Sequence, residues 1–284
     1  MKEIQKSLRL LTEEFYQIID EHNVKKPRAN NWFNVVVTAS FIKQLEFLKQ
    51  INLETNKSNI FFFMPVMRGL CEDLITLKFI KEKFPRDKHK IIKLLMNQEN
   101  YTRLRSQSDF FKKYKSNQMV LSHKLYSSYK QIRSGLSDIL KRNGINSNKL
   151  PPVEKMAKEI DMVDIYNYLY TASTDLVHFR VGTLLKMGWS ATQNSKNTFR
   201  FSTKNFYIYY DYFLCFYSTF LFVEFTKTFK SILDIKNRKW EIIKELDSSI
   251  LNCYKYPELV TYEELNLKRP SPIVEALMRV SKEK

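Results

Sequence analysis

The chain contains very few residues that interrupt regular helices. Only 5 glycines and 8 prolines occur among its 284 residues, and these two residue types mark most breaks between secondary-structure elements. Apolar residues recur at three- and four-residue spacing over long segments, as in helices that place one face against a core. The sequence therefore predicts an all-α fold, a bundle of about eight to ten helices joined by short polar loops.

Prolines and polar caps divide the chain into the expected helices. Pro85 ends a long helix that has Pro65 inside it, and Pro151 begins the clearest break in the chain. We expect an N-terminal part, residues 1–150, and a C-terminal part, residues 151–284, that pack as one compact unit. The expected helices span about residues 2–21, 32–50, 56–84, 86–115, 117–142, 153–159, 161–179, 205–233 and 239–251.

Two segments depart from the general pattern. Residues 183–203 place apolar stretches on either side of the polar turn TQNSKN, which predicts a small β-hairpin. Residues 206–225 are rich in phenylalanine and tyrosine and are long enough to cross a bilayer. Asp211 and Glu224 lie inside this second segment, and carboxylates are costly in lipid. We interpret it as the central buried helix of the bundle and do not expect a membrane partner.

The charge balance indicates an anionic partner. The formal net charge is +17, and such an excess attracts phosphate backbones or lipid headgroups. Residues 81–142 interleave cations with aromatic rings, a combination that follows phosphates and stacks on bases. The alternative is a solvated basic face over an aromatic core stripe. The candidate nucleic-acid-binding residues are Arg103, Arg105, Lys112, Lys113, Lys130 and Arg133.

Cysteine usage indicates a reducing compartment. Cys71, Cys215 and Cys253 are odd in number, far apart and set among apolar residues, which is typical of buried free thiols. The N-terminus lacks the uninterrupted apolar stretch of a secretory signal, so we expect a cytoplasmic protein. No His and Cys spacing suggests zinc, and no glycine-rich phosphate loop occurs. We therefore expect neither a metal nor a cofactor.

The first candidate site residues lie on the helix expected over residues 56–84. Arg68 and Glu72 are one turn apart within a stripe of apolar residues, and a charged pair is costly to bury unless it is hydrogen-bonded. One interpretation is an intrahelical bridge that also ties neighbouring helices together. In the other, Arg68 binds an anionic group, and Glu72 orients it or accepts a proton.

The second set lies on the helix expected over residues 161–179. Tyr170, Thr174 and His178 follow one another at four-residue spacing and so form a polar line on one helix face. A phenol, a hydroxyl and an imidazole are groups used in general acid–base chemistry. The structural alternative is a hydrogen-bonded strip packed against other helices.

These five residues resemble the pattern of an uncharacterised bacterial helical domain of unknown function. That family combines Arg-x-x-x-Glu on an apolar helix with Tyr-x-x-x-Ser/Thr-x-x-x-His roughly a hundred residues later, and the resemblance covers about residues 30–235. Thr174 stands where serine is more common, and Phe179 follows the histidine where proline is usual.

The chain is also similar to the HEPN superfamily of helical bundles. HEPN proteins are frequent in bacterial toxin–antitoxin and antiviral defence systems, and many are metal-independent ribonucleases, so the resemblance implies an action on RNA. Their usual mark is an Arg followed roughly four to six residues later by a His on one helix. No histidine here has an Arg at that distance, so the two groups would come from separate helices.

Two functional hypotheses follow from these residues. In the first, the protein is a nuclease that prefers RNA to DNA: Arg68 stabilises the phosphate and His178 is the general acid or base. Glu72 then orients Arg68, while Tyr170 and Thr174 position His178 or the substrate. In the second, the protein is a non-catalytic interaction module whose basic surface docks nucleic acid or an acidic partner protein encoded nearby. Pairing of two copies as a homodimer is compatible with both hypotheses.

Overall fold

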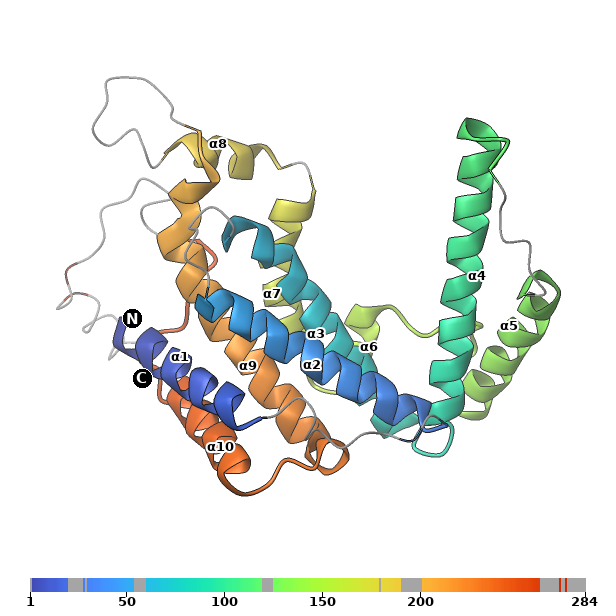
Figure 1. Ribbon diagram of the computed structural model, residues 1–284, viewed down its shortest axis with the longest axis horizontal. Helices are drawn as coiled ribbons and strands as arrows, with labels where there is room; N and C mark the ends of the chain where they lie inside the picture. Colours follow the sequence, from blue (N-terminus) through green and yellow to red (C-terminus); the bar gives the residue numbers. More distant parts are fainter. Residues whose placement is uncertain are drawn as a thin grey trace.

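The structure of the protein is a computed structural model that describes residues 2–19, 28, 30–53, 60–118, 125–178, 180–189, 201–260, 271 and 274. Within these ranges the chain is all-helical and contains no strand, which confirms the predicted fold class (Figure 1). The elements are α1 (Lys2–Ile18), α2 (Trp32–Leu53), α3 (Ile60–Lys83), α4 (Lys88–Tyr114), α5 (Leu125–Arg142), α6 (Val153–Glu159), α7 (Val163–Val177), α8 (Val181–Trp189), the 3-10 helix η3 (Thr203–Phe206), α9 (Tyr207–Leu233) and α10 (Asn237–Leu251).

The β-hairpin predicted over residues 183–203 is wrong where the structure describes that segment. Val181–Trp189 forms α8 instead, and residues 190–200 lie outside the described ranges. Thr183 is buried, and burial returns about one turn later, whereas Leu184 is exposed. Side chains of a strand would alternate at every second residue. The burial of this segment therefore follows the helical period.

Helix α9 forms the centre of the core. It packs against α1, α2, α3 and α10, so helices from both halves of the chain meet around it. The ring of Phe222 packs against Phe15 of α1 and Phe41 of α2, with centroid distances of 5.4 and 5.5 Å. The aromatic segment over residues 206–225 is therefore part of the core. None of the described helices has the length and apolar character needed to cross a membrane.

A carboxylate of this aromatic segment is buried and paired. Asp211 of α9 is only 8% exposed. Its Oδ1 accepts a hydrogen bond from Nη2 of Arg9, and its Oδ2 accepts one from Nε2 of Gln5, each at 2.5 Å. Both donors belong to α1. Because an unpaired buried charge is strongly unfavourable, these bonds explain how α9 tolerates the carboxylate, and they hold α1 against α9.

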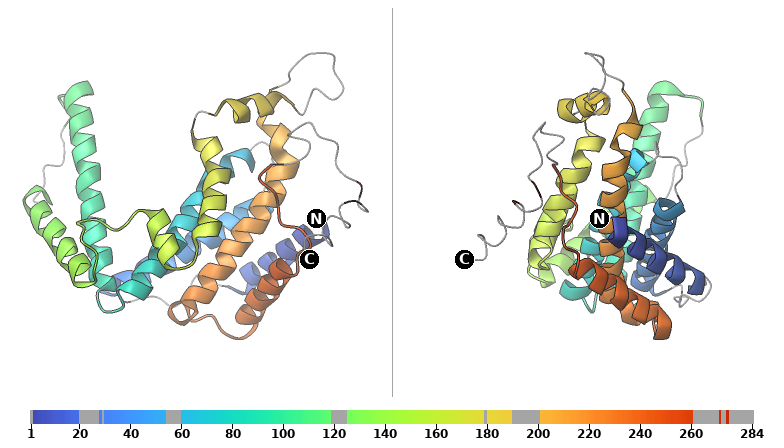
Figure 2. Two further views of the ribbon diagram at one scale, coloured as in Figure 1. Left: turned by 180° about the vertical axis from the view of Figure 1, so that it is seen from behind. Right: turned by 90° about the vertical axis from the view of Figure 1, so that its left-hand side faces the viewer.

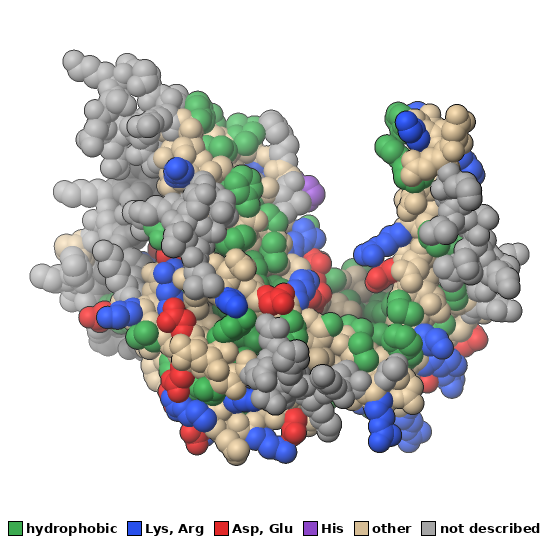
Figure 3. All heavy atoms as spheres, in the orientation of Figure 1, with side chains coloured by type: hydrophobic (Ala, Val, Ile, Leu, Met, Phe, Trp, Pro, Cys, Tyr) green, Lys and Arg blue, Asp and Glu red, His purple; other side chains and the backbone are tan. Residues whose placement is uncertain are grey.

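Helices α4 and α5 form an arm that projects from the rest of the molecule. Figures 1 and 2 show α4 rising away from the helices around α9, with α5 beside it. The arm is attached where α4 packs against α2 and α3, and Ile91 and Ile92 are buried at this base. The space-filling view shows an open notch between the arm and the side of the molecule formed by α3 and α7 (Figure 3).

Candidate functional site

Helix α3 supplies the ionic part of the candidate site. Its buried face carries Met67, Leu70 and Cys71, and Arg68 and Glu72 lie beside this face. Nε of Arg68 donates a hydrogen bond to Oε1 of Glu72 at 2.8 Å. The two side chains retain 27% and 31% of their exposure. The pair expected from the four-residue spacing therefore forms, and solvent still reaches it.

Helix α7 places an aromatic ring against this pair. The guanidinium carbon of Arg68 lies 4.3 Å from the centroid of the Tyr170 ring, in a cation–π contact. Tyr166, one turn earlier, packs on Tyr170 with a centroid distance of 5.6 Å. Arg68, Glu72, Tyr166 and Tyr170 are called the Arg68 cluster below. The cluster joins α3 to α7, which pack directly against each other.

The cluster keeps its guanidinium charged and one of its phenols neutral. The hydrogen bond to Glu72 raises the pKa of Arg68, an effect that burial partly opposes. Burial raises the pKa of Tyr166, and the negative charge of Glu72 acts in the same direction. At neutral pH the cluster therefore presents a permanent cation beside a phenol that can donate a hydrogen bond.

Thr174 and His178 lie beyond this cluster, toward the C-terminal end of α7. Thr174 is buried, and its Oγ1 has no hydrogen-bond partner among the described residues. Helix α7 ends at Val177, so His178 is its C-cap: its backbone N–H donates to the carbonyl of Thr174 at 3.0 Å, and its side chain is exposed. At a rise of 1.5 Å per residue, His178 lies about 12 Å along the helix from Tyr170. Of the five predicted residues, the structure brings Arg68, Glu72 and Tyr170 together.

Sequence reasoning missed Tyr166 as a member of the cluster. The signal was available, because Tyr166 precedes Tyr170 by four residues in the run IYNYLY and residues at this spacing are neighbours on a helix surface. The polar line through Tyr170 was followed only toward the C-terminal end of the helix. The residue one turn before Tyr170, on the N-terminal side, was therefore not considered.

The predicted nucleic-acid-binding residues lie on the arm. Arg103, Arg105, Lys112 and Lys113 are exposed on α4, and Arg133 is exposed on α5. The side chain of Lys130 lies outside the part of α5 that the structure describes. Figure 3 shows side chains of both charge signs on the α7 side of the notch and also on the arm. The notch therefore has polar groups on both of its sides.

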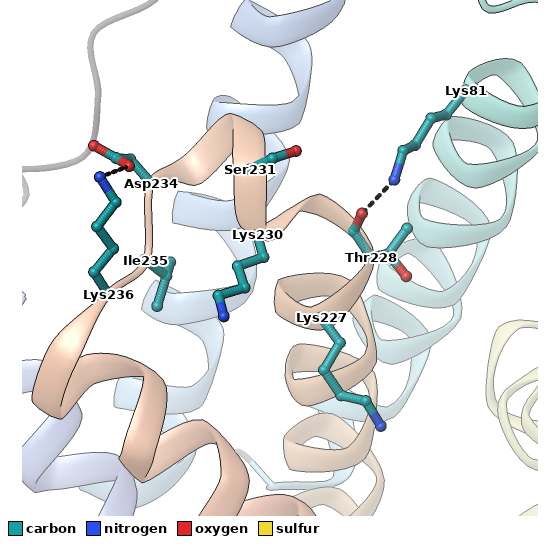
Figure 4. A pocket seen from close by; sticks show the side chains of 8 residues that line it. All are labelled: Lys81, Lys227, Thr228, Lys230, Ser231, Asp234, Ile235 and Lys236. Carbon is teal, nitrogen blue, oxygen red and sulfur yellow. Dashed lines mark hydrogen bonds and ion pairs between the residues drawn. The ribbon is translucent and has the colours of Figure 1, made fainter.

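A separate surface pocket of about 360 Å³ lies between α3 and the end of α9 (Figure 4). None of the predicted site residues lines it. Lys81 donates to the carbonyl of Thr228 at 2.6 Å, next to Phe229, where the backbone of α9 departs from helical geometry. Lys227 and Lys236 each pair with a carboxylate at 2.8 Å. These contacts engage three of the lysines that line the pocket.

The described residues contain no group of three or more His, Cys, Asp or Glu side chains placed to hold a metal ion. The chemistry available to the Arg68 cluster itself is anion binding and hydrogen-bond donation, from a guanidinium and two phenols.

Comparison with known protein families matches residues 34–196 to a family of unknown function, DUF5677. This segment is more than half of the 284-residue chain. The chain belongs to the DUF5677 family. The expected resemblance to an uncharacterised domain is thereby confirmed. The DUF5677 segment contains the whole Arg68 cluster, Thr174, His178 and the arm, whereas α1, α9 and α10 lie outside it. Neither curated proteins nor solved structures give a significant match.

Proposed function

We propose that this DUF5677 protein acts on RNA as a metal-independent ribonuclease of a bacterial defence or toxin system. Arg68 binds and stabilises the phosphate, and His178 is the general acid or base. The observation that supports the proposal most is that the Arg68 guanidinium is held in place and still exposed to solvent. Its guanidinium is held 2.8 Å from Glu72 and 4.3 Å from the Tyr170 ring, yet the side chain remains 27% exposed.

A guanidinium held in this way is well suited to a phosphate. Its Nε donates to Glu72, and its two terminal nitrogens make no hydrogen bond or ion pair within the described residues. Those nitrogens can donate two parallel hydrogen bonds to phosphate oxygens. Because Glu72 and Tyr170 already fix the side chain, little conformational entropy is lost when the anion binds. Tyr166 and Tyr170 add ring faces on which a base can stack.

His178 contributes the group that can move a proton. Its imidazole is exposed at the end of α7, about 12 Å along the helix from Tyr170. A strand of RNA lying along α7 passes both residues. Cleavage of one phosphate by the two groups requires that the side chains of Arg68 and His178 reach toward each other across this separation in the RNA complex. Proton transfer by a positioned side chain accelerates reactions by about 10²- to 10⁴-fold.

The accessibility of the cluster supports a site more than a sealed structural network. A network that only fixes helix register should be buried with every polar atom paired. Here Arg68, Glu72 and Tyr170 are each at least 27% exposed, and the buried hydroxyl of Thr174 is unpaired within the described chain. If the protein binds RNA without cleaving it, the alternative function, a non-catalytic interaction module, applies instead.

The test is a cleavage assay on labelled single-stranded RNA and DNA with excess EDTA. Wild type should cleave RNA, whereas His178→Ala and Arg68→Lys should bind it and cleave at least about 100-fold more slowly. Lys158→Ala is the control, because it breaks another ion pair at four-residue spacing, that of Lys158 with Glu154 on α6. Cleavage by His178→Ala at the wild-type rate, or binding without cleavage by wild type, would contradict the proposal.

A further inference from the structure

The free end of α4 carries two neighbouring aromatic rings that the fold leaves exposed. Phe110 is 57% exposed and Tyr114 is 62% exposed. They are one turn apart, with ring centroids 4.7 Å apart and planes inclined by 34°. The ring of Phe111 also contacts Phe110, edge to face, with a centroid distance of 5.9 Å. The rings expected to form a core stripe of this helix are therefore on its surface at this end.

The exposure is unusual for this chain. Phenylalanines are the largest fully buried side chains around α9. The rings at the end of the arm, in contrast, are exposed to solvent. Neighbouring exposed apolar groups often mark interaction sites. Toward its base, α4 buries Ile91 and Ile92. Toward its free end, the rings of Phe110 and Tyr114 face solvent instead.

The rings are surrounded by positive charge. Residues 103–115 contain five cationic side chains and one anionic side chain, Asp109, and all six are exposed. Nζ of Lys113 lies 5.2 Å from the centroid of the Tyr114 ring. Asp109 is 3.8 Å from Arg105, with both side chains more than 60% exposed, so it neutralises little of the charge. An anionic occupant with flat apolar faces fits this surface.

We infer that this end of α4 binds unpaired nucleotides, which makes single-stranded RNA the substrate class of the proposed function on which this inference rests. Phe110 and Tyr114 stack on bases, while Lys112, Lys113 and Lys115 contact the backbone phosphates. Only unpaired bases offer free faces, because a duplex stacks its bases on one another and displays mainly its backbone and 2′-hydroxyls. The arm and the helices that carry the Arg68 cluster, α3 and α7, lie on opposite sides of the notch (Figures 1 and 3), so a strand held by the arm can extend toward these helices.

The test measures fluorescence anisotropy of the full chain with a labelled mixed-sequence RNA of about 16 nucleotides, single-stranded or annealed to its complement. The double variant Phe110→Ala/Tyr114→Ala should bind the single strand at least about tenfold more weakly and bind the duplex within about twofold of wild type. Phe110→Trp/Tyr114→Trp should retain single-strand binding, because it keeps both ring faces. Tyr254→Ala, which removes another exposed ring (76%), should bind like wild type.

A charge variant separates stacking from phosphate contact. Lys112→Gln/Lys113→Gln should weaken both RNAs and reduce the slope of log affinity against log salt by about 1.4 for the single strand, at about 0.7 per phosphate contact. The ring variant should leave that slope unchanged, because it removes no charge. Surface substitutions of this kind have small effects on folding, which circular dichroism checks.

The outcomes distinguish this inference from the proposed function. If wild type cleaves RNA but the alanine ring variant binds single strands like wild type, the inference is overturned and the proposed function stands. If no cleavage occurs but the ring variant loses single-strand binding, the inference stands and the nuclease fails. A ring variant that changes the molar mass in light scattering, with RNA affinity unchanged, would assign the rings to contact with a second copy and overturn the inference.

Discussion

Replacing Asp211 by asparagine should destabilise the protein by about 2–3 kcal/mol. The change keeps the size of the side chain and removes its charge, so Arg9 loses the carboxylate that it contacts at 2.5 Å. Nε of Arg9 is already buried without a partner among the described residues. Breaking a fully buried pair costs about 3–5 kcal/mol. The Arg9 side chain is 28% exposed and that of Asp211 is 11% exposed. Water therefore partly solvates the unpaired Arg9 guanidinium, and we expect a smaller loss of stability than for a fully buried pair.

The assay is urea unfolding followed by circular dichroism, with thermal unfolding as a second measure. For 284 residues the unfolding entropy is about 0.6 kcal/mol/K, so a loss of 2–3 kcal/mol lowers Tm by about 3–5 °C. Breaking the exposed pair of Lys236 with Asp234, at 69% and 46% exposure, by Lys236→Gln should cost less than about 0.5 kcal/mol.

A compensating variant tests the physical reason. Arg9→Met/Asp211→Leu replaces both charges by apolar side chains, and such replacements of buried pairs are often neutral or stabilising. We expect it to recover most of the stability lost in Asp211→Asn. If Asp211→Asn costs no more than Lys236→Gln, the carboxylate does not hold α1 against α9 and the reasoning is refuted.

Three further predictions concern stability and thiol reactivity. Gly135→Ala should stabilise the arm by up to about 1 kcal/mol in urea unfolding, because the added methyl group would lie 3.6 Å from a leucine of α4 and alanine favours helix; a loss of stability would contradict this. Burial raises the pKa of Cys71 and of Cys215 to about 12, so at pH 8 both should react with a thiol reagent only as the protein unfolds, and rapid reaction of either in the native state would contradict it. Burial lowers the pKa of His89, whose Nδ1 accepts the N–H of Phe33 at 3.3 Å. Stability should therefore be highest above about pH 6.5 and fall as the pH drops through the lowered pKa, an acid loss that His89→Gln should reduce in urea unfolding at pH 7.5 and about pH 5.5.

Most helices could be predicted because their signals are long and repeated. Stripes of apolar residues at three- and four-residue spacing mark α1 to α5, α7, α9 and α10 over at least 15 residues each. Helix α8 has nine residues, too few for the spacing to be distinguished from that of a strand. The polar TQNSKN run that follows then favoured a hairpin, although apolar residues beside a turn do not by themselves specify strands.

The candidate site could be predicted within a helix but not between helices. The four-residue spacing of Arg68 and Glu72 implies their contact, since both belong to one rigid element. The contact of Arg68 with Tyr170 depends on how α3 packs against α7, which no local pattern specifies. The helical line through Tyr170 was extended to His178, but α7 ends at Val177. The eight-residue spacing of Tyr170 and His178 already implies an offset of about 12 Å along a helix, so this separation could have been foreseen from the sequence.

The attachment of the arm at one end makes its reach depend on a few residues at its base. Helix α4 has 27 residues and is therefore about 40 Å long, so a tilt of about 5° at the base displaces the far end by about 3.5 Å. The packing of α4 against α2 and α3 at this base, where Ile91 and Ile92 are buried, thus sets the width of the notch. A conservative change at this base therefore alters the width of the notch, and with it the distance that a strand would have to span in the proposed RNA complex.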